Sequence, residues 1–281
     1  MAIVLKAQAK INLTLEVLGR REDGFHEIRS VVQRISLADT LTLAPARDLT
    51  LSCNRSELNG PDNLVWQAAT LLKEEHGGEV GAEMTLMKRI PVAAGLGGGS
   101  SDAAAALRGL NQLWKVGVEQ DRLLELGARL GSDVPFFLLD GPCAHMEGRG
   151  ERLTVLPPLP LRWIVLVKPE AGISAGAVYR AFPEASWSSG RRTADWLAQS
   201  AHEGSVPSPF NDLERVALGL VPAAGVARQA LLNAGAKIAV MSGSGSTYFA
   251  LFESESAATR VVERAREAGE GEAFLASFVT L

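Results

Sequence analysis

A segment rich in glycine and serine, "PVAAGLGGGSSDAAAAL", runs from Pro91 to Leu107 and is the part of the sequence best suited to chemistry. Glycine is costly to order, so several glycines together indicate a loop that needs bare backbone. Backbone N–H groups in such a loop can converge on an anion. The alanine-rich run that follows predicts a helix, and its N-terminal N–H groups and dipole favour an anion at the same place. Ser100 and Ser101 add hydroxyl donors. We therefore predict a phosphate-binding loop.

Two familiar loops of this kind do not fit the segment. A Walker A loop ends in Gly-Lys-Ser/Thr, whereas Gly98 and Gly99 run directly into Ser100. A dinucleotide fingerprint that began at Gly95 would place its third glycine where Ser100 stands. A flexible linker is the plain alternative, but a linker has polar flanks of low complexity. Here a predicted strand precedes the loop and a helix with an apolar stripe follows it, so the pattern favours a third kind of phosphate loop.

A second glycine cluster lies in "MSGSGSTYFALF", from Met241 to Phe252. Gly243 and Gly245 predict a tight turn whose amides would face the same ligand as the first loop. A plain glycine hairpin between two strands accounts for the pattern equally well.

Apolar and polar residues alternate from Leu5 to Val17, which is typical of a strand with one buried face. Lys10 and Asn12 both fall on the polar face of that strand. Asp133 stands in "LGSDVPFF", after a predicted helix end. From the sequence alone it fits a turn residue and a general base equally well.

The remaining patterns place these residues among helices and strands. Helices are predicted at residues 61–75, 100–114, 121–130, 174–182, 210–218, 221–234 and 256–268. Further strands are predicted at residues 28–37, 40–43, 83–90, 163–167, 237–241, 247–252 and 274–281. The polar stretch 185–204 is expected to be a surface excursion. The proline-rich stretch 154–163 marks a boundary between domains at 1–158 and 159–281. The irregular alternation of strand and helix predicts two α+β domains.

The composition is that of a soluble globular protein. Of the 281 residues, 47% are hydrophobic and 21% charged, and the net charge of -4 argues against a broad nucleic-acid surface. The two cysteines, Cys53 and Cys143, make neither a disulfide framework nor a zinc site, so we expect core or surface thiols in a reducing cytosol. The N-terminus has no basic leader and the chain has no apolar run of bilayer length. These features predict a cytoplasmic protein with no membrane partner.

Several segments together carry a family resemblance: "AKINLTLEVLGRREDGFHE", the glycine loop, "GSDVPFFL", "FNDLE" and "GSGSTYFAL". They resemble the galactokinase–homoserine kinase–mevalonate kinase–phosphomevalonate kinase (GHMP) superfamily. Within it, the "DGFHE" and "GLGGGSSDAA" motifs are most similar to the branch that phosphorylates diphosphocytidyl-methylerythritol. The resemblance covers nearly the whole chain and is weakest at residues 185–204.

The resemblance implies an α+β fold of two domains, a ribosomal S5 domain 2-like N-terminal domain and a ferredoxin-like C-terminal domain. It implies transfer of the ATP γ-phosphoryl group, with Mg2+, to the C2 hydroxyl of the methylerythritol unit, in non-mevalonate isoprenoid biosynthesis. The metal ligands are not assigned, and the expected assembly is a monomer or a weak homodimer. The alternatives are a homoserine- or mevalonate-type kinase and a nucleotide-binding module without catalysis.

The resemblance also implies roles for individual residues. Asp133 matches the family's general base and Lys10 its catalytic lysine, which would hold that carboxylate ionised. Without the resemblance, Lys10 would be an ordinary strand lysine. Predicted substrate contacts are Asn12, Phe25, His26 and Tyr179. Phe25 offers a stacking face to cytosine and His26 a donor and an acceptor, although a hairpin-tip aromatic packed on the core is the alternative for Phe25.

The nucleotide side completes the predicted site. Predicted ATP-binding residues are Pro91, Val92, Ala93, Ala94, Gly95, Leu96, Gly97, Gly98, Gly99, Ser100, Ser101, Asn63 and Lys88. Asn63 fits a helix cap as well, and Lys88 fits a solvated charge at a strand end. Asp102 is interpreted as a first-turn carboxylate favoured by the helix dipole.

Overall fold

The computed structural model describes residues 1–280, which form two compact units. The first unit comprises Met1–Ala9, Ala38–Val92 and Gly97–Asp140, and the second comprises Lys10–Leu37, Ala93–Leu96 and Gly141–Leu281. Two long strands, β1 (Ile3–Arg20) and β2 (His26–Ala46), contribute residues to both units. The units are therefore not continuous in sequence, and the division into domains at 1–158 and 159–281 stays a prediction.

The strands form two sheets. The larger has the order β3-β4-β2-β1-β8, with β5 paired to β2 and β6 to β5, and the smaller has the order β11-β7-β10-β9. Parallel pairs are β3 with β4 and β1 with β8. The other strands are β3 (Leu49–Cys53), β4 (Gly81–Met87), β5 (Cys143–Gly148), β6 (Arg152–Val155), β7 (Trp163–Lys168), β8 (Phe210–Asn211), β9 (Val240–Met241), β10 (Tyr248–Phe252) and β11 (Glu272–Ser277).

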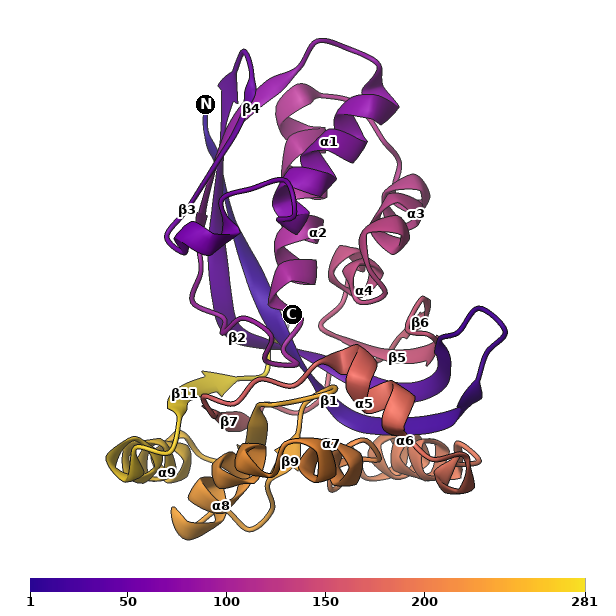
Figure 1. Ribbon diagram of the computed structural model, residues 1–281, viewed down its shortest axis with the longest axis vertical. Helices are drawn as coiled ribbons and strands as arrows, with labels where there is room; N and C mark the ends of the chain where they lie inside the picture. The colour runs from indigo at the N-terminus through magenta and orange to yellow at the C-terminus, as the bar shows by residue number, and fades with distance from the viewer. Residues whose placement is uncertain (281) are drawn as a thin grey trace. The chain divides into compact units, whose positions relative to one another are not determined.

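Helices of the first unit cover one face of its strands (Figure 1). They are the short 3-10 helix η1 (Ser56–Leu58), α1 (Leu64–His76), α2 (Gly98–Trp114), α3 (Gln120–Leu130) and α4 (Val134–Leu138). The predicted apolar stripe of α2 is confirmed, because Ala103, Leu107 and Leu110 are fully buried. The amide oxygen of Asn63 accepts from Val65 N at 2.9 Å, so the predicted cap of α1 is confirmed. Gly77 ends the helix in the left-handed conformation.

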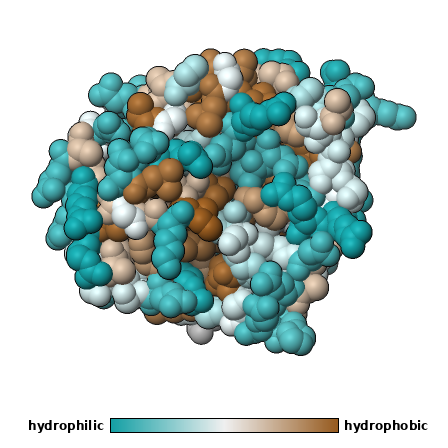
Figure 2. All heavy atoms as spheres, turned by 90° about the horizontal axis from the view of Figure 1, so that it is seen from below, coloured by the Kyte–Doolittle hydropathy of each residue, from teal (hydrophilic) through white to brown (hydrophobic). Residues whose placement is uncertain are grey.

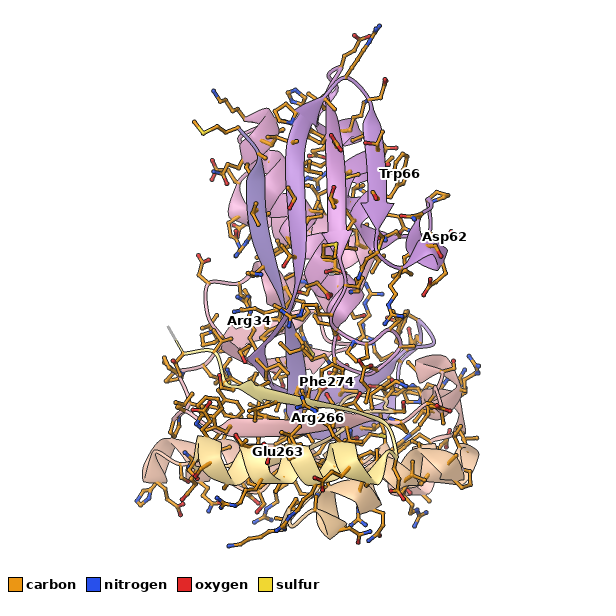
Figure 3. All side chains as sticks on the ribbon, turned by 90° about the vertical axis from the view of Figure 1, so that its left-hand side faces the viewer. Arg34, Asp62, Trp66, Glu263, Arg266 and Phe274 are labelled. Carbon is orange, nitrogen blue, oxygen red and sulfur yellow. The ribbon has the colours of Figure 1, made fainter. Side chains whose placement is uncertain are left out.

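Helices of the second unit pack on its four-stranded antiparallel sheet, chiefly α8 and α9. The set is α5 (Ala175–Ala181), η2 (Glu184–Ser186), α6 (Arg191–Glu203), α7 (Glu214–Leu220), η3 (Pro222–Ala224), α8 (Gly225–Asn233) and α9 (Glu255–Ala268). Figure 3 shows Arg266 of α9 beside β11, which carries Phe274. The guanidinium of Arg266 donates to the carbonyl of Ala273 at 3.1 Å. Figure 2 shows one face of the molecule, where hydrophilic side chains surround hydrophobic ones near the middle.

Four predictions about the elements are wrong. Residues 28–37 and 40–43 belong to one strand, β2. The stretch 185–204 is not a simple surface excursion, because α6 buries Thr193 and Trp196. Phe210 starts strand β8 rather than a helix, and α7 begins only at Glu214. The polar face of β1 is buried from Lys10 onward, as the apolar face is. The sequence patterns also missed β3, β5, β6 and α4, and residue 281 of the last predicted strand lies outside the described residues.

Both cysteines are buried and form no disulfide, which confirms one of the two predicted states. Burial raises the pKa of the Cys143 thiol to about 12. Within residues 1–280, no helix is long and apolar enough to cross a bilayer.

Candidate active site

The first half of the glycine loop, Ala93–Leu96, belongs to the second unit and packs on the second glycine cluster. Gly95 has a φ of +74°, and a Cβ there would lie 2.2 Å from the carbonyl oxygen of Ser242. The Ser242 hydroxyl donates to the Gly95 carbonyl at 3.0 Å, and Thr247 N donates to the Ala94 carbonyl at 3.3 Å. β9 and β10 also pair as an antiparallel hairpin. The two glycine segments are thus in contact. That both face the same ligand stays a prediction.

The second half of the loop opens helix α2 in the first unit. Gly97 precedes the helix with a φ of +68°, and its carbonyl accepts from Ser101 N at 2.9 Å. The helix begins at Gly98, two residues before the predicted start at Ser100. A Cβ on Gly98 would meet Ile90 at 2.9 Å and the Lys88 Nζ at 3.3 Å. A larger residue at Gly98 would therefore have to displace the side chain of Ile90.

Lys88 lies between two buried carboxylates in the first unit. Its ammonium contacts Asp102 Oδ2 at 2.6 Å and also pairs with Asp39 Oδ2. Asp39 Oδ1 in turn accepts from the backbone N–H groups of Arg89 and Ile90, the latter at 2.8 Å. Asp39 thus fixes the chain just before the glycine loop, and Lys88 ties it to the first turn of α2.

This arrangement corrects two interpretations. Lys88 is 8% exposed, so it is not a solvated charge. Burial lowers the pKa of Lys88, but the charges of Asp102 and Asp39 outweigh this effect, so the pKa lies above its ordinary value. Asp102 is buried and paired, so its role is more than a favourable place in the helix dipole. Burial and the charge of Asp39 raise the pKa of Asp102 to about 7 despite the Lys88 ammonium. Its Oδ1 accepts no hydrogen bond within the described chain.

Lys10 and Asn12 lie close together in the second unit, both buried. Lys10 Nζ donates to Asn12 Oδ1 at 2.7 Å, and Asn12 Nδ2 donates to Ser30 Oγ at 2.8 Å. The Ser30 hydroxyl donates to the Thr14 carbonyl at 2.5 Å. Lys10 is thus not the ordinary exposed lysine of a strand surface.

The same buried face of β1 continues to Glu16, which holds the start of α6. The carboxylate accepts from Thr193 N at 2.7 Å and from the Ser188 hydroxyl. Burial raises the pKa of Glu16, but these hydrogen bonds outweigh it, so the pKa lies below its ordinary value. A carboxylate from a strand therefore satisfies an N–H group at the N-terminus of α6, which Gly190 cannot cap with a side chain.

Asp133 lies in the first unit, immediately before α4. All five residues of α4, Val134–Leu138, are buried, and Pro135 occupies its first turn. The carboxylate is half-buried and does not cap the helix. Asp133 therefore directly precedes a buried helix, and its catalytic role stays a prediction.

The predicted base-binding residues Phe25, His26 and Tyr179 all belong to the second unit. Phe25 is 48% exposed, so it does not pack on the core, and the Arg149 guanidinium lies 4.9 Å from its ring centre. Its N–H donates to the Asp23 carboxylate at 3.1 Å, which fixes the turn. The rings of His26 and Tyr179 lie 5.3 Å apart. Burial, with Arg20, lowers the pKa of His26 and favours the neutral ring with one donor and one acceptor.

A hollow of about 380 Å³ in the first unit lies elsewhere. It opens between α1 and the end of α3, beside Trp66 and Arg129. None of the predicted site residues lines this hollow, so the prediction does not depend on it.

Comparison with known proteins decides the family. A model described as the GHMP kinases N terminal domain matches residues 63–141, and one described as GHMP kinases C terminal matches residues 185–271. A 4-diphosphocytidyl-2-C-methyl-D-erythritol kinase of Dehalococcoides mccartyi is 42% identical over 280 residues, with 98% of each chain covered. The chain belongs to the GHMP kinase family.

Other relatives place it within one branch of these kinases. Proteins named 4-diphosphocytidyl-2-C-methyl-D-erythritol kinase from Pelotomaculum thermopropionicum and Citrifermentans bemidjiense are 44% and 43% identical. The alignments cover 96% of each chain in the first case, and 90% of this chain and 91% of the relative in the second. A crystal structure of 4-(cytidine 5'-diphospho)-2C-methyl-D-erythritol kinase superposes with a TM-score of 0.86 at 37% identity, covering 99% of this chain and 100% of that one.

The predicted two-domain GHMP kinase fold is thereby confirmed, and the kinase uses ATP to phosphorylate a small molecule. A homoserine kinase from Cytophaga hutchinsonii, at 18% identity and a TM-score of 0.71 over 99% of this chain and 95% of that one, shares the fold. The roles of the individual site residues stay predictions.

Four residues around the kinase's predicted site were missed by the sequence analysis: Asp39, Ser30, Glu16 and Asn211. The amide of Asn211 donates to the carbonyls of Met241 and Gly243, both at 2.7 Å, so it fixes the second glycine cluster. Asn211 stands in the quoted "FNDLE" motif, which could have indicated it. Asp39, Ser30 and Glu16 are polar residues within strands, and only their burial reveals them.

Proposed function

We propose that the chain transfers the ATP γ-phosphoryl group to the C2 hydroxyl of 4-diphosphocytidyl-2-C-methyl-D-erythritol. The products are the 2-phosphate and ADP, and the step belongs to non-mevalonate isoprenoid precursor biosynthesis. Relatives that are 42–44% identical and nearly as long carry the name of this activity, which supports the substrate.

The proposed roles follow the chemistry of phosphoryl transfer, which depends on positioning and electrostatics. The glycine loop, residues 91–101, binds the triphosphate through its N–H groups, with Asn63 and Lys88 on the nucleotide side. Asp133 accepts the proton of the C2 hydroxyl, and the Lys10 ammonium stabilises negative charge on the attacking oxygen. Lys88 is held between two carboxylates, so we expect it to act chiefly by shaping the loop.

The observation that carries the substrate assignment is the group of rings in the second unit. Phe25 presents an exposed ring, and the ring of its sequence neighbour His26 lies 5.3 Å from that of Tyr179. An exposed ring and a neutral histidine suit the face and the edge of cytosine. Homoserine and mevalonate have no base, so these rings would have no purpose in a kinase for either of them.

We propose that Mg2+ accompanies the ATP and neutralises charge on its phosphates. Within the described residues no three His, Cys, Asp or Glu side chains gather as a metal site. The chain therefore suits a metal held mainly by phosphate oxygens and water, with the hydroxyl of Ser100 or Ser101 as its protein ligand.

We also propose a cytoplasmic monomer or weak homodimer with a small-molecule substrate and no nucleic-acid partner. The net charge of -4 supports the last point.

A substrate panel tests the proposed function. The purified chain is incubated with Mg-ATP and, separately, diphosphocytidyl-methylerythritol, homoserine, mevalonate and galactose, and ADP release is measured. We expect turnover with the cytidylated alcohol alone, and the phosphate at C2 by NMR. His26→Ala should raise the KM for that alcohol and leave the KM for ATP unchanged. Phosphorylation of homoserine or mevalonate in its place would refute the assignment, and so would ATP binding without turnover of any alcohol.

A further inference from the structure

A series of buried hydrogen bonds links Lys10, Asn12, Ser30 and the Thr14 carbonyl. The donor and the acceptor of each bond are determined by the chemistry of the groups. The Thr14 carbonyl can only accept, and it takes the single proton of the Ser30 hydroxyl at 2.5 Å. Ser30 Oγ therefore has only lone pairs to offer to Asn12. The side chain of Asn12 must present its NH2 group there, as it does at 2.8 Å.

The other end of the Asn12 amide is then determined as well. With Nδ2 on Ser30, Oδ1 faces Lys10 Nζ, and the two atoms lie 2.7 Å apart. A carboxamide turned over by 180° would place an NH2 group against the ammonium, so two donors would face each other. It would also place Asn12 Oδ1 against the lone pairs of Ser30 Oγ, so two acceptors would face each other where Asn12 is 2% and Ser30 0% exposed.

We propose that Ser30 is a positioning residue for phosphoryl transfer, because its hydroxyl fixes the Asn12 amide and thereby directs the Lys10 ammonium. The inference rests on the proposed catalytic role of Lys10. It gives Asn12 a role in orienting the lysine, in addition to the substrate contact that the sequence predicts.

Close packing around the amide supports this role. A Cβ on Gly243 would lie 3.4 Å from Asn12 Oδ1, so the second glycine cluster approaches the same amide oxygen. Neither end of the amide faces open solvent, since Asn12 is 2% exposed. The orientation of Asn12 is thus set by the protein, and Ser30 is the group that distinguishes its two ends.

Ser30→Ala tests the inference. It removes the acceptor for Asn12 Nδ2 and frees the amide to turn, so we expect kcat to fall about tenfold, the effect of one lost buried hydrogen bond. The KM for ATP should stay unchanged, because the change does not touch the glycine loop. The side-chain NH2 protons of Asn12, followed by NMR, should exchange with solvent faster than in the wild type.

Thr193→Val is the matched control, because it removes a buried hydroxyl that lies 3.3 Å from Thr14 Oγ1 but outside this series of hydrogen bonds. It should keep the wild-type kcat and the slow exchange at Asn12. Ser30→Thr, which keeps the hydroxyl, should restore slow exchange and most of kcat.

Two results would overturn the inference: unchanged exchange at Asn12 in Ser30→Ala, or unchanged kcat in a folded Ser30→Ala enzyme while Lys10→Ala has lost activity. If Lys10→Ala itself kept the wild-type kcat, the catalytic role of Lys10 would fail. The NMR measurement would then still decide whether Ser30 orients the amide.

Discussion

Asp133 is the residue whose chemistry the sequence leaves most open, because a turn aspartate and a general base fit its motif equally well. The structure holds it half-buried at the start of the buried helix α4. If it accepts the substrate proton, Asp133→Asn should lower kcat by ~10² or more, the scale of a lost general base. ATP affinity, measured by calorimetry, should not change.

Asp140→Asn is the control for that variant. Asp140 follows α4 with its side chain 92% exposed, and its carboxylate lies 3.2 Å from Arg108. We expect wild-type kinetics from it. Equal turnover in wild type and Asp133→Asn would remove Asp133 from the mechanism.

Asp102 predicts how stability depends on pH. Its pKa is raised from 3.8 to about 7, so between these values the folded chain holds a proton that the unfolded chain has released. The free energy of unfolding must then fall as pH rises through this window, by at most about 1.4 kcal/mol per pH unit from this group, and level off above it. Asp102→Asn removes this contribution. Urea unfolding at pH 4.5 to 8 should therefore show Asp102→Asn gaining stability relative to wild type as pH rises towards 7.

Asp62→Asn serves as the comparison, because Asp62 is an exposed carboxylate at the start of α1 (Figure 3). Its pH dependence should match the wild type. If the Asp102→Asn curve also ran parallel to the wild type, the assignment of a raised pKa to Asp102 would be wrong.

For single residues, the sequence predicts which side chains could do the chemistry, but it does not predict their burial or their hydrogen-bond partners. The motif residues Lys10 and Lys88 were identified, whereas their burial and their partners were not. Asp39 interrupts the apolar pattern of β2, so the pattern predicts a break there. The strand continues because the Asp39 carboxylate binds Arg89 N, Ile90 N and Lys88. A distant partner of this kind leaves no mark in local periodicity.

A substitution in the glycine loop should lower stability through the contact between this loop and the second glycine cluster. Gly95 has a positive φ, and a Cβ would overlap the Ser242 carbonyl at 2.2 Å. Gly95→Ala should therefore lower the free energy of unfolding by roughly 2 kcal/mol or more, since both backbone strain and a clash oppose it. Thermal or urea unfolding measures this directly.

Gly219→Ala in α7 is the control, because no atom lies within 4 Å of a Cβ there and its φ is ordinary. It should stabilise the chain by about 0.5–1 kcal/mol, as alanine does in a helix. A Gly95→Ala chain as stable as wild type would contradict the contact between the two glycine segments.

Regular patterns predicted most elements, and the errors share one cause. Alternation in β1 indicated one buried face, but α6 covers part of the polar face, where Glu16 and Thr193 are bonded. The same contact explains why 185–204 is more than the predicted surface excursion, because this polar stretch forms α6 and buries Thr193 and Trp196. Phe210 was assigned to a helix, whereas pairing with Thr14 of β1 makes it a strand. Contacts between segments far apart in sequence decided each case.

For the whole molecule, length, composition and family resemblance indicated the fold correctly. The order of segments along the chain does not predict the compact units, because β1 and β2 each contribute residues to both units.

The most direct test of the account is a crystal structure of the chain with diphosphocytidyl-methylerythritol and a non-hydrolysable ATP analogue. We predict the γ-phosphate on the N–H groups of residues 95–101, and the C2 oxygen within about 3 Å of both Lys10 Nζ and the Asp133 carboxylate. A triphosphate bound away from the glycine loop, or a C2 oxygen remote from that lysine and aspartate, would contradict it.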